Sequence, residues 1–199
     1  MKIDIYNTNN KYSIIYADPP WKYNDESSKA SRTVNLQYDT MKTKDMFNFP
    51  INKISANNSV CFMWATYPKL KESIELLEKW GFIYKTVAFT WVKKNRKNND
   101  YFMGMGYYTR SNAEIVLLGV KGKPLKRISH SVRQILDNRI DEHSKKPNEV
   151  RDRIVELFGN LPRIELFARQ SVEGWDCWGN EVEKYSITTE QLMFDETKL

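Results

Sequence analysis

The sequence has few of the features that mark a secreted protein, a protein stabilised by bound metal ions or a membrane-spanning protein. Its two cysteines, Cys61 and Cys177, lie far apart and lack the spacing of a metal-binding pair. The start of the chain is polar, unlike a signal peptide, and no apolar run approaches the roughly 20 residues that cross a bilayer. We therefore expect a reduced, cytoplasmic protein with no metal site and no membrane contact.

Size and charge predict one basic domain. With 199 residues, the chain is long enough to bury about 70% of its unfolded surface in a single core. We expect this domain to span residues 1–183, followed by a polar tail over residues 184–199. The formal charge of +6 favours a polyanionic partner.

The cations gather in two clusters, at 93–97 and 121–127, each directly after a predicted strand. If both clusters flanked one pocket, they would contact phosphates, and binding would weaken steeply with salt. A solvated charged loop is an equally good interpretation of either cluster alone.

Apolar strands alternate with amphipathic helices along the chain. Helices are expected from Pro68 to Gly81 and from Pro147 to Gly159, and a short one is expected to be capped by Thr43. The expected strands are 12–18, 59–65, 85–93, 113–121 and 163–169. This alternation predicts an α/β fold with a mostly parallel sheet covered on both faces.

Polar residues stand at the carboxyl ends of three of these strands. They are Asp18, Thr66 and Arg169. Ligands of such sheets bind beyond the carboxyl ends of the strands, so the pattern predicts a site on one rim.

The first predicted strand stops at Asp18-Pro19-Pro20-Trp21. Prolines cannot donate ladder hydrogen bonds, so the strand must end here and send the Asp18 side chain into a loop. A carboxylate and a proline carbonyl only accept hydrogen bonds, and two acceptors aimed at one place suit an NH2 group. Trp21 adds a flat face for stacking on a base. The motif predicts a pocket for an aminated base; the plainer alternative is a strand end with a capping Asp and a core Trp.

These four residues resemble the catalytic tetrad of the MT-A70 family, adenine amino-methyltransferases that use S-adenosylmethionine. The resemblance covers roughly residues 12–182, in the order of the family. Its further blocks are residues 38–41, 63–66, 91–94, 113–119, 143–147, 164–169, 174–176 and 178–181.

The resemblance implies a three-layer Rossmann-like methyltransferase fold in circularly permuted order, with the catalytic motif before the cofactor motif. The absence of a glycine-rich loop after the first strand agrees with that order. It also implies methyl transfer from S-adenosylmethionine to the 6-amino group of adenine. DNA is favoured over RNA, because the short chain resembles bacterial and phage members, and the protein would work in the cytoplasm of a bacterial or phage-infected cell.

The resemblance also implies the cofactor contacts. Asn180 and Glu181 resemble ligands of the ribose hydroxyls, although many members have Gln at the second position. Lys146 resembles a lysine that reaches the methionine carboxylate or the target base. The full implied set is Asp18, Lys146, Glu165, Arg169, Ser171, Asn180 and Glu181.

Substrate contacts come from the resemblance and from the basic cluster. Trp21 would stack on the base, and Tyr38, Trp91 and Glu114 resemble residues around the target adenine. The cluster adds Lys94 and Arg96 as phosphate contacts.

The catalytic residues would be Asp18, Pro19, Pro20 and Trp21. The adenine amino nitrogen is a poor nucleophile, because its lone pair is delocalised into the ring. Hydrogen bonds from the amino group to Asp18 and to the Pro19 carbonyl would localise that lone pair for in-line displacement on the sulfonium. Asp18 or a water would then take the proton, and a target in duplex DNA would first have to be flipped out.

Two irregular stretches are expected beside the site. Residues 23–35 are polar and lack glycine, which predicts a mobile loop over the site. Residues 95–112 mix glycine, methionine and tyrosine with cations, a mixture that suits unstacked bases and equally suits simple loop packing.

Three other functions remain compatible with the sequence. One is methylation of adenosine in RNA, and another is methylation of the cytosine amino group. The third is a non-catalytic nucleic-acid-binding partner of an active subunit, against which the intact Asp-Pro-Pro-Trp tetrad argues. A homodimer is compatible with the sequence, which does not define the oligomeric state.

Overall fold

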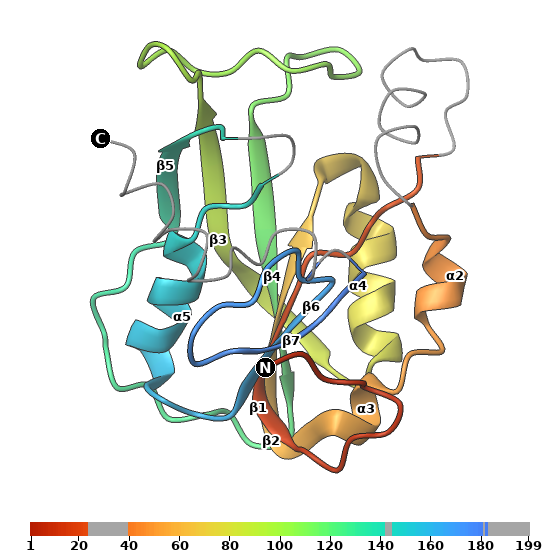
Figure 1. Ribbon diagram of the computed structural model, residues 1–199. Helices are drawn as coiled ribbons and strands as arrows, with labels where there is room; N and C mark the ends of the chain where they lie inside the picture. Colours follow the sequence, from red (N-terminus) through yellow and green to blue (C-terminus); the bar gives the residue numbers. More distant parts are fainter. Residues whose placement is uncertain (24–39, 142–144, 181, 183–199) are drawn as a thin grey trace, which may run out of the picture.

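A seven-stranded sheet runs through the centre of the computed structural model, with the strand order β5-β3-β4-β2-β1-β6-β7 (Figure 1). The structure describes residues 1–23, 40–141, 145–180 and 182. The strands are β1 (Tyr12–Ala17), β2 (Ser55–Ala65), β3 (Ile83–Lys94), β4 (Ala113–Lys121), β5 (Ile135–Arg139), β6 (Arg163–Leu166) and β7 (Asp176–Trp178). All neighbouring pairs are parallel except the two that involve β4. The predicted α/β fold with a mostly parallel sheet is confirmed.

Side chains alternate along β1 and enter two separate cores, as the period of a strand requires. Ile15 and Ala17 pack in the cluster that contains helices α2 (Thr43–Met46), α3 (Ile51–Ile54) and α4 (Leu70–Lys79). Ile14 and Tyr16 pack in the cluster that contains α5 (Glu149–Phe158). Helices therefore cover both faces of the sheet, in three layers (Figure 1).

The two long helices begin and end where the sequence predicts. Pro68 lies in the single turn η1 (Tyr67–Lys69) that leads into α4, and Gly81 follows α4 with a φ of 89°. Pro147 precedes α5, and Gly159 ends it with a φ of 73°. Residues that carry a side chain rarely adopt these φ values, so a glycine at each position allows the helix to end there.

The short helix α2 begins at the predicted Thr43, but Lys42 occupies its N-cap position and no side chain caps it. The predicted cap by Thr43 is therefore wrong. Met46 of this helix is buried.

Strand boundaries differ from the prediction at two functional ends. β1 stops at Ala17, one residue before Asp18, and β6 stops at Leu166, because Phe167 has a left-handed φ of 60°. Strands β5 and β7 were not expected. Both strands are short. In β5 only Leu136 is buried, and exposed residues stand on either side of it.

The topology gathers the predicted site at one rim of the sheet. The carboxyl ends of β1, β2, β3 and β6 point the same way, and β4 starts there because it runs in the opposite direction. Asp18, Thr66 and Arg169 all lie beyond this edge. The two basic clusters lie at opposite ends of the sheet, since β3 ends at Lys94 on the rim and β4 ends at Lys121 on the far side.

Within the described residues, no helix has both the length and the apolar character needed to cross a membrane.

Candidate active site

The Asp-Pro-Pro-Trp turn leaves the sheet between β6 and β2. The Asp18 N–H donates to the Leu166 carbonyl at 3.4 Å, and the Trp21 N–H donates to the Pro19 carbonyl at 2.9 Å. The Trp21 indole N–H points to the Trp64 carbonyl at 3.4 Å, and the residue is only 6% exposed. The turn is therefore anchored by its tryptophan, while the Asp18 side chain keeps 25% of its surface exposed.

A chain of alternating charges crosses the rim beside this turn. Lys146 Nζ lies 3.2 Å from Asp18 Oδ1 and 3.2 Å from Glu114 Oε2. Glu114 in turn binds the Lys93 ammonium. The side chains of Lys146 and Glu114 are each 12% exposed, so these charges are largely shielded from water.

The pKa directions follow from this arrangement. Burial raises the pKa of the Asp18 carboxyl, with Lys146 acting against it. Burial also acts to raise the pKa of Glu114, but Lys146 and Lys93 outweigh it and lower that pKa to about 2. The two carboxylates raise the pKa of Lys146 against the effect of its burial. At neutral pH, Lys146 is therefore a cation held between two acidic side chains.

The rings of Trp64 and Trp91 lie beneath these charged side chains and form a tryptophan floor. The ammonium of Lys146 lies 5.4 Å from the ring of Trp64, and that of Lys93 lies 4.9 Å from the ring of Trp91. The two rings meet edge to face at 6.1 Å. Trp91, predicted as a substrate contact, is only 3% exposed and donates its indole N–H to the Asn138 carbonyl at 3.2 Å.

A buried ion pair supports the site from below. Glu165 on β6 accepts two hydrogen bonds from Arg151 on α5, at 2.7 and 2.8 Å, and both residues are under a tenth exposed. The Arg151 guanidinium also lies 5.7 Å from the ring of Tyr16, whose hydroxyl accepts the Trp64 indole N–H at 2.6 Å. The predicted Glu165 is thus linked through Arg151 and Tyr16 to the tryptophan floor.

The end of β7 approaches the same rim. A Cβ on Gly179 would lie 2.2 Å from the Ala168 carbonyl oxygen, so only glycine permits this close approach. Asn180, the next residue, is exposed at this edge, and Arg169 influences the charge of Asp18. Ser171 is also exposed, and its hydroxyl lies 3.6 Å from Cys177 Sγ.

The donors and acceptors on this rim fit S-adenosylmethionine chemically. Lys146 offers a cation for a carboxylate, and Asp18 offers an anion for the ammonium group. The exposed amide of Asn180 suits the ribose hydroxyls. The described residues contain no group of three or more His, Cys, Asp and Glu able to hold a metal ion.

The predicted phosphate contacts lie apart from this cluster. Lys94 pairs with Asp137 on β5 at 2.7 Å, and Arg96 donates to the Asp141 carbonyl. Their neighbour Lys93, which was not predicted, is the lysine that faces Glu114. Because side chains alternate between the two faces of a strand, Trp91 and Lys93 lie on the same face of β3. This two-residue period is the sequence signal that could have identified Lys93.

Some predicted residues fall outside the described part of the chain. They are Tyr38, Glu181 and the tail 184–199, together with residues 24–35 of the expected loop. Tyr23, the first residue of that loop, is described, and its hydroxyl lies 2.8 Å from Thr66 Oγ1. Lys93, Trp64, Arg151 and Tyr23 are the site neighbours that the sequence did not single out.

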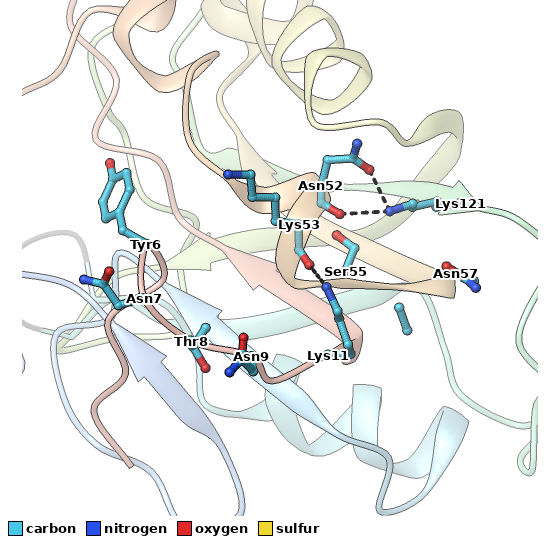
Figure 2. A pocket seen from close by; sticks show the side chains of 11 residues that line it. Tyr6, Asn7, Thr8, Asn9, Lys11, Asn52, Lys53, Ser55, Asn57 and Lys121 are labelled. Atoms are coloured by element: carbon cyan, nitrogen blue, oxygen red, sulfur yellow. Dashed lines mark hydrogen bonds between the residues drawn. The ribbon is translucent and has the colours of Figure 1, made fainter.

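Two hollows among the described residues lie at opposite ends of the sheet. One of about 270 Å³ adjoins the rim and is lined by Lys146, Asn138 and neighbouring residues. The other, of about 680 Å³, surrounds the start of β2 and is lined by Lys11, Lys53, Lys121 and several asparagines (Figure 2). The smaller hollow is the one next to the candidate site, because Lys146, which lines it, also contacts Asp18 of the Asp-Pro-Pro-Trp turn.

Comparison with known proteins found a matching family and several similar proteins. The MT-A70 family model matches residues 12–181. The chain is 39% identical to the Type II methyltransferase M.MunI of Mycoplasma sp, over 94% of this chain and 85% of that protein. It is 28% identical to the putative N(6)-adenosine-methyltransferase MT-A70-like of Medicago truncatula and 27% identical to the human N(6)-adenosine-methyltransferase catalytic subunit METTL3. These two alignments cover 92% and 87% of this chain but only 28% of each relative.

Proposed function

This chain belongs to the MT-A70 family of S-adenosylmethionine-dependent methyltransferases, and from that membership we propose that it methylates the exocyclic 6-amino group of adenine in DNA. One observation carries the proposal. An acidic side chain on an Asp-Pro-Pro-Trp turn is held beside a shielded lysine, above a tryptophan floor. Adenine is favoured because the plant and human relatives are named N(6)-adenosine-methyltransferases.

Asp18 and the Pro19 carbonyl would orient the amino group of the base. The carboxylate accepts hydrogen bonds only, and the Pro19 carbonyl, which already accepts from the Trp21 N–H, has a second lone pair to offer. Two acceptors fix the amino nitrogen and direct its lone pair away from the ring. Such positioning is the main catalytic contribution available to a displacement that needs no covalent enzyme intermediate.

Lys146 would control the charge of Asp18. In the structure its ammonium lies between Asp18 and Glu114, which stabilises both carboxylates. A cofactor carboxylate arriving at Lys146 would compete with Asp18 for the same cation and leave Asp18 more available to the base. Asp18 is then also the nearest proton acceptor after methyl transfer, or it passes the proton to water.

S-adenosylmethionine would supply the methyl group from its sulfonium, whose sulfur would leave as a neutral thioether when the bond to the methyl carbon breaks. We propose that Asp18, Lys146, Glu165, Arg169, Ser171, Asn180 and Glu181 form its site. Of these, Glu165 reaches the site as a partner of Arg151, so its contribution would be to hold the end of β6 in place. The catalytic domain would comprise residues 1–183, with 184–199 as an appended tail.

DNA is the first candidate because the chain is 39% identical to the mycoplasma Type II methyltransferase, against 28% and 27% for the Medicago and human adenosine methyltransferases. RNA is the second candidate, supported by those same adenosine relatives.

The test is transfer of labelled methyl from S-adenosylmethionine to duplex DNA, single-stranded DNA and RNA in parallel. Asp18→Ala should lower transfer by about 10³-fold, because it removes the acceptor for the amino group. Asp45→Ala, which changes an exposed carboxylate on α2, is the matched control and should retain full activity.

Label in adenine of DNA that disappears in Asp18→Ala supports the proposal. Label only in RNA, or in cytosine, would replace it with one of the alternatives. If the wild-type protein binds the cofactor and labels none of the three, a non-catalytic partner role is the better account.

A further inference from the structure

The connection between β3 and β4 projects beyond the rim that carries Asp18, at the top of Figure 1. It is an ordered hairpin in two stages. Lys94 bridges Tyr101 near its base, and Gly104 bridges Ser111 near its tip, where the Gly104 N–H donates to the Ser111 carbonyl at 2.9 Å. Residues 105–110 form the tip.

Large hydrophobic side chains of this hairpin face solvent. Tyr107 is 92% exposed and Tyr108 is 95% exposed, and Met103 and Met105 are each about 70% exposed. The two tyrosine rings meet edge to face, with centroids 5.1 Å apart. Simple loop packing, one of the two interpretations of this stretch, does not describe these rings. Apolar surface presented in this way generally marks a binding site.

The tip holds these rings on a tightly closed backbone. A Cβ on Gly106 would lie 1.9 Å from the Thr109 carbonyl oxygen, so the turn closes only with glycine at this position. Tyrosines on such a turn lose little conformational freedom when they bind a partner.

The base of the hairpin is joined to the ion network of the site. The Phe102 N–H donates to the Lys93 carbonyl at 2.9 Å, and the Lys93 ammonium binds Glu114. Glu114 shares Lys146 with Asp18. The exposed rings and the catalytic carboxylate are therefore carried by connected parts of one rim.

The charge of the hairpin favours a polyanion. Between residues 95 and 112 there are three cations, Arg96, Lys97 and Arg110, against one acid, Asp100. Cations would meet phosphates, and flat rings would meet unstacked bases, since stacking on aromatic side chains is tolerant of base identity.

We propose that Tyr107 and Tyr108 stack on DNA bases beside the target adenine and hold the duplex open while the target lies at Asp18. This inference rests on the proposed function, because it assigns the hairpin to the same substrate. Base flipping needs such a group, since extruding a nucleotide sacrifices the stacking that the inserted ring restores.

The experiment compares wild type with a Tyr107→Ala, Tyr108→Ala double variant and a Tyr107→Phe, Tyr108→Phe double variant. The substrate is a duplex that the wild-type enzyme methylates, with 2-aminopurine at the methylated position in a parallel sample. The alanine variant should raise the KM for duplex DNA by about 10- to 100-fold and lose the fluorescence increase of 2-aminopurine. The phenylalanine variant, which keeps both rings, should stay within about 2-fold of wild type, and the KM for S-adenosylmethionine should not change in either.

The result separates failure of this inference from failure of the proposed function. If wild type does not methylate DNA, the proposed function fails and this inference falls with it. If wild type methylates DNA and the alanine variant keeps its KM and its 2-aminopurine signal, only the inference is overturned. Sedimentation velocity adds a further overturning outcome, in which the wild-type protein is a dimer and the alanine variant a monomer, so that the rings bind a second copy.

Discussion

Each end of the sheet carries lysines and a surface hollow, but the lysines at the two ends have different hydrogen-bond and ion-pair partners. At the rim, Lys146 lies between two carboxylates above a tryptophan ring, and its pKa is raised. At the far end, Lys121 donates to Asn52 at 2.7 Å, and burial together with nearby Lys11 lowers its pKa. The far-end hollow has the larger volume, about 680 Å³ against about 270 Å³, and none of the described residues that line it is a carboxylate (Figure 2).

The difference shows that paired charges, more than volume, distinguish the end that we propose as the active site. Opposite charges above an aromatic ring hold each other in place and favour the ionised form of both, and an ionised Asp18 is the hydrogen-bond acceptor that the proposed reaction needs. Lysines that bind only amide and carbonyl oxygens can attract anions but cannot orient an amino group. Changing matched residues at the two ends therefore tests the comparison directly.

The largest effect is expected from the buried ion pair beneath the rim. Arg151→Ala would leave the Glu165 carboxylate buried without its guanidinium, so the free energy of unfolding should fall by about 3–5 kcal/mol. Lys11→Ala at the far end removes an exposed ammonium that donates only to the Lys53 carbonyl, and should change stability by less than about 0.5 kcal/mol. Urea unfolding followed by tryptophan fluorescence measures both. If the free energy of unfolding falls by a similar amount in the two variants, the buried ion pair does not stabilise the rim more than an exposed lysine stabilises the far end.

The next largest effect concerns the two lysines themselves. Lys146→Met should lower kcat/KM for methyl transfer by about 10²-fold, since it removes the cation shared by Asp18 and Glu114. Lys121→Met removes the same charge from the far end and should stay within about 2-fold. Lys146→Arg retains the charge and should recover part of the activity, which separates loss of charge from loss of packing. Equal loss in both methionine variants would indicate that only overall charge matters.

Much of the rim follows from the sequence because it depends on strand ends. Proline stops β1 next to Asp18 wherever the strand lies, and parallel strands bring their carboxyl ends to one edge. The period of β3 places Lys93 on the same face as Trp91, but the sequence could not show that this face meets Glu114, because that depends on the register of β3 against β4. Trp91 pairs with Glu114 across the two strands, so Lys93 lies on the same face as Glu114 and binds it. Lys94 pairs with Asp137 instead.

Other features depend on tertiary packing and carry no local signal. Arg151 has the sequence pattern of an exposed helical arginine, and it is buried only because Glu165 on β6 faces α5. Phe167 adopts a left-handed φ of 60° while its ring packs against Phe49, Trp80 and Trp178. A contact between distant segments outweighs the local preference of a phenylalanine.

The smallest effect is a pH dependence that the rim should have and the far end should lack. The folded pKa of Glu114 is about 2, below its unfolded value of about 4.3, so its ionised form stabilises the fold above pH about 4.3. That stabilisation is lost as the pH falls from about 4 toward about 2. Between pH 6 and pH 3, wild type should therefore lose about 1–2 kcal/mol more of its unfolding free energy than Glu114→Gln, which has no carboxyl to protonate.

Lys121→Met is the matched control for this pH dependence. The described residues that line its hollow include no carboxylate, and Lys121 stays protonated throughout the acidic range, so its stability difference from wild type should be the same at pH 6 and pH 3. Taking the difference between each variant and wild type removes the protonation of carboxyls that the variants share. If Glu114→Gln and wild type lose stability in parallel, Lys93 and Lys146 do not hold Glu114 ionised, and the contrast between the two ends rests on Asp18 alone.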